Sequence, residues 1–174
     1  MEEVRSLIHC SSVSGNQGSS TSSSTPLGAG NYQIVFEFDN ALSSGIGASA
    51  TATKTGGGSQ PVTVSSSQIG LNNHEYLINL TGVPNAQYVT VTLTGVAGAA
   101  NGGTVIGPQM GFLVGDVNAS GHVDAGDIGA IQQVNSQTAN STNFRADVNA
   151  SGHIDAGDVG LTQNDNSNGL PSSP

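Results

Sequence analysis

The chain contains 174 residues and has a formal net charge of −9 at pH 7, although only 9% of its residues are charged. A chain of this length can form one ordinary domain together with a small one. Its only lysine and arginine residues are Arg5, Lys54 and Arg145, so it has no basic patch for phosphate contacts and is not expected to bind nucleic acid. No stretch approaches the roughly 18 apolar residues of a membrane-spanning helix, so we expect no transmembrane segment.

Residues 1–30 are expected to form a flexible N-terminal extension. Val4, Leu7 and Ile8 make a short apolar patch that can form a β-strand over about residues 3–10, but no partner strand is nearby in the sequence. Residues 11–30 are rich in Ser, Gly and Thr, as in a flexible linker. About twenty such residues typically span about 25 Å, which is enough to carry residues 1–10 onto a neighbouring molecule. The alternative is a disordered N-terminal tail.

The same N-terminal segment shows no secretory signal, because its apolar run is too short and it contains two acidic residues. Cys10 is the only cysteine, so we expect a free thiol and no internal disulfide.

Residues 31–115 are predicted to form an all-β domain. Apolar residues alternate with polar ones, with the period of two that a half-buried strand requires. The predicted strands cover residues 32–38, 48–54, 61–65, 76–80, 89–93 and 110–114. Six or seven short strands with frequent turn signals are typical of an immunoglobulin-like β-sandwich. The last strand runs directly into Asp116, so we expect this domain and the next module to form one rigid body.

A twelve-residue sequence occurs twice near the C-terminus, at residues 116–127 and 147–158. Ca²⁺ takes roughly six to eight oxygen ligands, and a loop of this length supplies them from side chains at positions 1, 3, 5, 9 and 12 and from a carbonyl at position 7. In the first loop these positions hold Asp116, Asn118, Ser120, Asp124 and Asp127, with the carbonyl oxygen of His122. In the second loop they hold Asp147, Asn149, Ser151, Asp155 and Asp158, with the carbonyl oxygen of His153. The sequence therefore predicts two Ca²⁺ sites.

Other loop positions support this prediction and indicate weak binding. Gly121 and Gly152 occupy position 6, where the chain must turn with a positive φ. Position 12 is Asp and position 5 is a neutral Ser, so each loop brings three carboxylates and an affinity of roughly 10⁻⁵ to 10⁻³ M is expected. Val123 and Ile154 at position 8 can pair the two loops back to back around a small shared core.

A short helix is expected after each loop, from Asp127 to about Val134 and from Asp158 to about Asn164. Such helices are too short to persist alone, so we expect the module to fold with its metal.

Two calcium loops, each followed by one short helix and carrying Asp at position 12, resemble the type I dockerin module of secreted bacterial proteins. The resemblance covers about residues 113–171, with Leu113 matched by Phe144 before each loop and Ile128 matched by Val159 after it. It implies a small α module at residues 116–171, an extracellular or cell-surface location and a cohesin-like protein as partner. Sandwich domains often precede such repeats, so residues 31–171 look like a C-terminal tandem of this kind.

The sequence departs from the dockerin pattern at the positions that recognise the partner protein. Dockerins often carry a Ser-Thr pair where this chain has Ala125-Gly126 and Ala156-Gly157, and a Lys-Arg pair is common where it has Gln132-Gln133. The predicted metal ligands therefore match the family pattern, whereas the residues at the partner-recognition positions differ from it.

No enzyme is expected. None of the four histidines lies in a nucleophile pattern, and the chain has no phosphate-binding glycine loop and no Cys/His zinc set. The sequence favours an extracellular, calcium-stabilised structural protein that assembles into filaments by donating its N-terminal strand to a neighbouring subunit. The alternatives are a dockerin module that binds a cohesin on a scaffold or cell-surface protein, and carbohydrate binding by the sandwich, for which surface aromatic residues are scarce.

Overall fold

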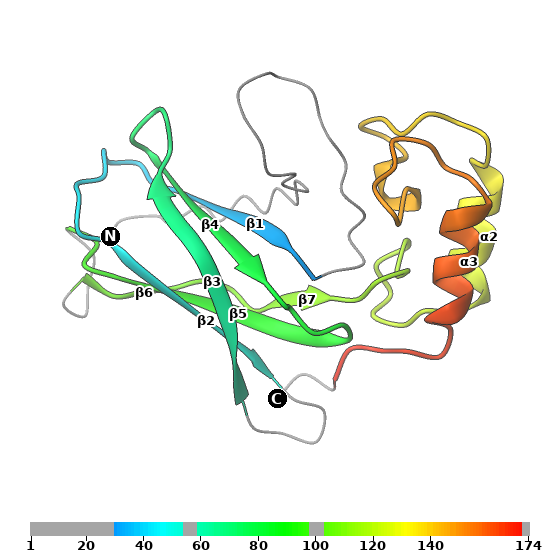
Figure 1. The fold of residues 1–174 in the computed structure, drawn as a ribbon, viewed down its shortest axis with the longest axis horizontal. Helices are drawn as coiled ribbons and strands as arrows, with labels where there is room; N and C mark the ends of the chain where they lie inside the picture. Colours follow the sequence, from blue (N-terminus) through cyan, green and yellow to red (C-terminus); the bar gives the residue numbers. More distant parts are fainter. Residues whose placement is uncertain (1–29, 54–58, 98–102, 172–174) are drawn as a thin grey trace.

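The computed structural model describes residues 30–53, 59–97 and 103–171. It consists of a curled β-sheet followed by a small helical module, and the two lie side by side (Figure 1). The predicted N-terminal extension, its donor strand at residues 3–10 and Cys10 lie outside the described residues. In the described part of the chain, no helix is long and apolar enough to cross a membrane.

The described residues between 31 and 115 are mainly β, as predicted. The strands are β1 (Tyr32–Glu37), β2 (Gly47–Thr53), β3 (Ser59–Ile69), β4 (Glu75–Thr81), β5 (Gln87–Thr94), β6 (Val105–Ile106) and β7 (Met110–Phe112). All pairings are antiparallel, and the strand order is β1-β4-β3-β2-β5-β6, with β7 also pairing with β5. Strand β3 is longer than its sequence pattern predicts, and β6 was not predicted, because its two residues are too few to show a period.

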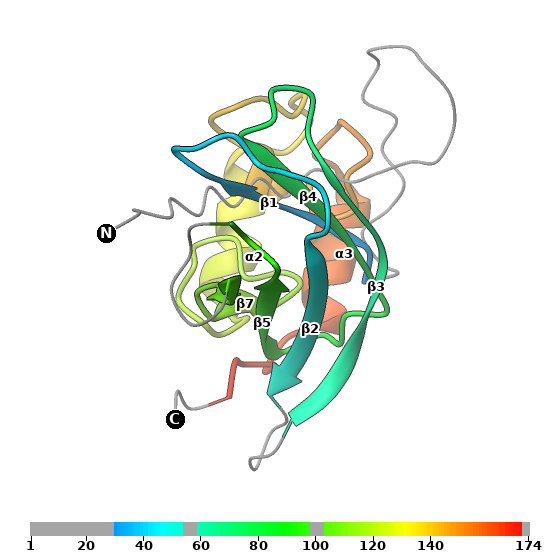
Figure 2. The same cartoon turned by 90° about the vertical axis from the view of Figure 1, so that its left-hand side faces the viewer.

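Strand β3 makes the sheet curl. Its first half pairs with β2 and its second half with β4, and the register shifts between Val64 and Ser66. A bulge of this kind bends the strand and increases its twist. As a result the two ends of the sheet meet, and the rings of Tyr32 in β1 and Phe112 in β7 pack with their centroids 4.5 Å apart. The strands curve around a common interior (Figure 2).

The immunoglobulin-like sandwich is not confirmed. In that fold the third strand pairs with the sixth in a separate sheet, whereas β3 pairs here with its two sequence neighbours, β2 and β4. The reason is the connection: β4 begins only a few residues after β3, and the Gly70 N–H donates to the Glu75 carbonyl oxygen at 2.7 Å. A turn this tight holds the two strands in one sheet.

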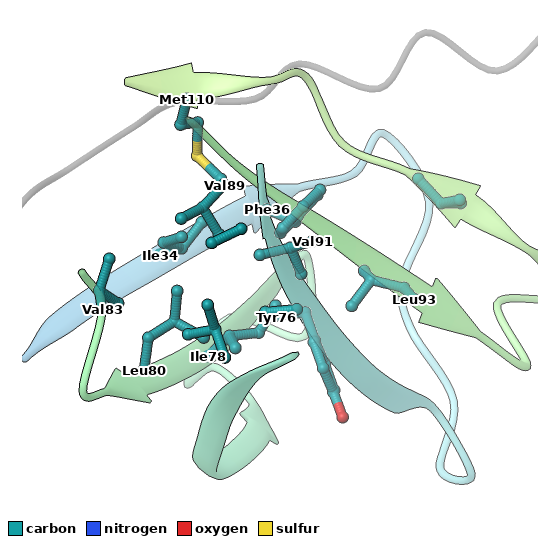
Figure 3. Close-up of a cluster of buried hydrophobic side chains, with 14 of the residues drawn as sticks. Ile34, Phe36, Tyr76, Ile78, Leu80, Val83, Val89, Val91, Leu93 and Met110 are labelled. Atoms are coloured by element: carbon teal, nitrogen blue, oxygen red, sulfur yellow. The ribbon is translucent and has the colours of Figure 1, made fainter. Parts of the chain in front are cut away.

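The core fills the inside of the curled sheet. Side chains from β1, β4 and β5 point toward one another (Figure 3), and Phe36, Ile78 and Val91 are fully buried. Tyr76 is also buried, and its hydroxyl donates to the Ile46 carbonyl oxygen at 2.7 Å, so its polar end is satisfied. The alternation of apolar residues along these strands therefore predicted the buried face correctly.

The helical module contains α2 (Ala125–Gln133), the 3₁₀ turn η2 (Phe144–Ala146) and α3 (Ala156–Asn164). Both α-helices begin two residues before the predicted start, because Asp124 and Asp155 serve as their N-caps. A second, smaller core holds the module together and consists of Ile131, Ala146, Val148 and Ile154.

Candidate metal centre

The two predicted loops fold in the same way, beginning with the aspartate at position 1. Asp116 accepts hydrogen bonds from the Ser120 N–H through Oδ1 and from the Gly121 N–H through Oδ2, both at 2.9 Å. In the second loop, Asp147 accepts the equivalent bonds from the backbone four and five residues later, at 2.9 and 2.8 Å. Each loop is thus closed around the carboxylate of its first residue.

The backbone turns as predicted at position 6. Gly121 has a φ of 81° and Gly152 a φ of 87°. Position 4 also has a positive φ, 61° at Ala119 and 54° at Ala150, which the sequence did not indicate because alanine rarely adopts this conformation.

Position 12 holds the most buried acids of the module, since Asp127 and Asp158 are both 0% exposed. Asp127 accepts three backbone hydrogen bonds, at 2.9 Å from Val117, 3.1 Å from Asn118 and 2.9 Å from Asp124. Asp158 accepts from the Asn149 and Asp155 N–H groups at 3.0 and 2.8 Å. These bonds tie the start of each loop to the first turn of its helix.

The module has little positive charge to offset these buried carboxylates. Arg145 is the single lysine or arginine in the described part of the chain, and it donates to the Val117 carbonyl oxygen at 3.5 Å rather than to either acid. A buried charge costs stability unless it is paired. A divalent cation bound by oxygen atoms fits this requirement.

The predicted ligands at positions 3, 5 and 7 lie close together in each loop. In the first loop, Asn118 Oδ1 accepts from the Ser120 N–H at 2.9 Å, and Ser120 Oγ donates to the His122 carbonyl oxygen at 3.0 Å. In the second loop the corresponding distances are 2.8 Å, from Asn149 to Ser151, and 2.9 Å, from Ser151 Oγ to the His153 carbonyl oxygen. Both histidine side chains are exposed, as expected if only their carbonyl oxygens face the site.

The carboxylates at position 9 act as helix caps. Asp124 Oδ1 accepts from the Gly126 N–H and Asp155 Oδ1 from the Gly157 N–H, both at 2.7 Å. Across the described residues, no three Asp, Glu, His or Cys side chains converge on one point as a metal site. The carboxylates accept hydrogen bonds from backbone N–H groups. The oxygen-rich donor set fits Ca²⁺, and the ligand assignment stays a prediction.

The two loops do not pair with each other, which corrects the predicted back-to-back contact of Val123 and Ile154. The backbone of Val123 pairs with residues 167–168, which follow α3, and the backbone of Ile154 pairs with residues 136–137, which follow α2. Each helix is followed by a turn and then by a short segment that forms a β-bridge with one loop, Thr138 with His153 and Gly169 with His122, so these segments occupy the hydrogen-bonding edges of the loops. Both side chains are nevertheless buried, as predicted.

Comparison with known protein families supports part of this interpretation. Residues 114–164 match the family model described as the dockerin type I domain, and the match covers less than a third of the chain. This region is therefore similar to a type I dockerin, a kind of module that binds calcium. Comparisons with curated proteins and with solved structures give no match. The secreted, bacterial origin stays a prediction.

Proposed function

We propose that the helical module binds two Ca²⁺ ions and acts as a calcium-dependent attachment module. The observation that carries this proposal is the near-identical folding of the two loops around Asp116 and Asp147, within the region that matches the dockerin type I model. A loop folded this way twice, at equivalent positions of a repeat, is expected of a paired calcium module and not of two unrelated turns.

The proposed ligands are the residues predicted from the sequence. The first site would be held by Asp116, Asn118, Ser120, Asp124, Asp127 and the His122 carbonyl oxygen, and the second by Asp147, Asn149, Ser151, Asp155, Asp158 and the His153 carbonyl oxygen. When bound, the divalent cation supplies two positive charges against the three carboxylates of each loop. Since each loop already ties its helix to its start through position 12, cation binding and folding of the module would be coupled.

We propose a cohesin-like protein as the partner and a non-catalytic, extracellular or cell-surface role. Ala125 and Gly126 at the start of α2, and Ala156 and Gly157 at the start of α3, are all exposed. Because these positions carry no hydroxyl groups, a partner would meet backbone and methyl groups there. The cohesin-like surface that fits them would rely on close packing rather than on side-chain hydrogen bonds.

Calorimetric titration with calcium tests the first part of the proposal. The wild-type chain is expected to bind two ions, and Asp116→Asn and Asp147→Asn are each expected to lose one of them. Absence of calcium binding would refute the proposal. Pull-down with cohesin-like proteins, in calcium and in chelator, tests the partner, and capture that is independent of calcium would count against it.

Self-assembly through residues 1–10 stays a prediction, because those residues lie outside the described part of the chain.

A further inference from the structure

The segment that follows α3 is paired along the first loop. We call residues 167–170 the C-terminal strap. The Ser167 N–H donates to the Val123 carbonyl oxygen, the Val123 N–H donates to the Asn168 carbonyl oxygen, and the Leu170 N–H donates to the Gly121 carbonyl oxygen, each at 2.9 Å. The strap therefore depends on the backbone of the first loop at positions 6 and 8.

The strap also reaches the β-sheet through Leu170. A Cβ atom added at Gly111 in β7 would lie 2.6 Å from Leu170 Cδ1 and 3.4 Å from Tyr88 Cε1. Gly111 and Tyr88 are register partners in β7 and β5. Leu170 therefore packs directly on the β5–β7 pair, and the chain after α3 runs back toward the sheet (Figure 1).

Asn85, in the turn between β4 and β5, makes a second contact between the sheet and the helical module. Its Nδ2 donates to Asp165 Oδ1 at 3.1 Å, and its Oδ1 accepts from the Val114 N–H at 2.8 Å. Asp165 is the C-cap of α3, and its Oδ1 also accepts from Asn168 Nδ2 at 2.8 Å. The strap, the end of α3 and the sheet are thus joined through one carboxylate.

The second loop has the same local pairing without the connection to the sheet. Residues 136–139, which follow α2, pair with it through the Ser136 N–H to the Ile154 carbonyl oxygen at 2.8 Å and the Ala139 N–H to the Gly152 carbonyl oxygen at 2.9 Å. Their side-chain contacts are with Asn140, whose Nδ2 donates to the Thr138 carbonyl oxygen at 3.4 Å, and with Asn143, whose Nδ2 donates to Gln137 Oε1 and to the Thr138 carbonyl oxygen, both at 3.2 Å. Asn140 and Asn143 both belong to the helical module, so none of these hydrogen bonds joins the segment to the β-sheet.

We propose that the first calcium loop, and not the second, controls the docking of the helical module on the β-sheet, through the C-terminal strap. This inference rests on the proposed calcium binding. The His122 carbonyl oxygen, a proposed ligand, lies between Gly121 and Val123, whose backbone groups hold the strap. A cation that holds this backbone in place also holds the strap. The strap in turn places Leu170 on the β-sheet and Asn168 beside Asp165.

Hydrogen exchange of the full-length chain, measured in millimolar calcium and in excess chelator, tests the proposal. The wild type is compared with two matched variants, Asp116→Asn in the first loop and Asp147→Asn in the second. The two aspartates make equivalent hydrogen bonds. We expect calcium to slow exchange of the Ser167 and Leu170 amides in the wild type and in Asp147→Asn. The slowing should reach about 100-fold when the calcium concentration is about a hundred times the dissociation constant. In Asp116→Asn this slowing should be lost.

Four outcomes would overturn the inference. If both variants keep the slowing, or if Asp147→Asn loses it as well, the first loop has no special control of the strap. If calorimetry shows two bound ions while the strap amides do not respond to calcium, control of docking by the first loop is refuted and the proposed function stands. If calorimetry shows no calcium binding, the proposed function and the control of docking by the first loop are refuted together.

Replacing Leu170 tests the strap without touching either loop. Leu170→Ala is expected to separate unfolding of the sheet from that of the helical module into two transitions, with calcium stoichiometry unchanged. Leu71→Ala is the matched control, because Leu71 is fully exposed at a turn. A single unfolding transition for Leu170→Ala, at the wild-type temperature, would show that the strap does not join the two parts.

Discussion

Replacing Asp127 with Ala should destabilise the helical module far more than replacing Asp124, although both remove one carboxylate from the same proposed site. Asp127 is fully buried and accepts backbone hydrogen bonds at 2.9, 3.1 and 2.9 Å. Removing the acceptor of these three hydrogen bonds costs about 1 to 3 kcal/mol each, so a loss of about 3 to 9 kcal/mol in the free energy of unfolding is expected. Losing the exposed cap at Asp124 should cost about 1 kcal/mol.

Urea unfolding followed by circular dichroism measures both variants, in millimolar calcium. Because each variant loses one proposed ligand, the difference between them reports the buried hydrogen bonds of Asp127 and not the metal. Asp127→Asn, which keeps one oxygen acceptor, should fall between the two and remains measurable if Asp127→Ala does not fold. Equal unfolding midpoints for Asp127→Ala and Asp124→Ala would refute the reasoning.

Four further predictions follow from the described residues. If the dissociation constant is about 10⁻⁵ M, the free energy of unfolding should be about 2.7 kcal/mol per site lower in excess chelator than in millimolar calcium. Calorimetric unfolding in the two solutions measures this difference. Phe36→Ala should cost about 3 to 5 kcal/mol because Phe36 is fully buried, and Leu71→Ala should change stability by less than about 0.5 kcal/mol, as urea titration can show. Gly129→Ala and Gly160→Ala, where an added Cβ meets nothing within 4 Å, should each stabilise their helix by up to about 1 kcal/mol, and a fall in melting temperature would contradict this. Deleting residues 1–30 should abolish any calcium-dependent light scattering if the N-terminal strand drives assembly, and unchanged scattering would exclude that strand.

Much of the candidate site could be predicted from the sequence because a calcium loop is a local structure. The ligand positions lie within twelve residues, and glycine at position 6 marks the turn, so Gly121 and Gly152 were predicted with positive φ and have it. The helix caps are similarly local, although Asp124 and Asp155 were assigned only as ligands. Their role as N-caps shifted each helix start by two residues.

The sequence by itself determined which residues face the core and where the loops turn. The alternation of Ile34 and Phe36, or of Ile78 and Leu80, is sufficient to mark a buried face, since side chains in a strand point alternately to the two sides.

Only the tertiary structure decided which strands pair and how the two modules join. The period of a strand carries no information about its partner, so the order that unites β1 to β7 in one curled sheet was not predicted. The contact of Asn85 with Asp165 spans 80 positions of the sequence. Such contacts depend on where the curled sheet places the turn relative to α3, which no pattern within either segment records.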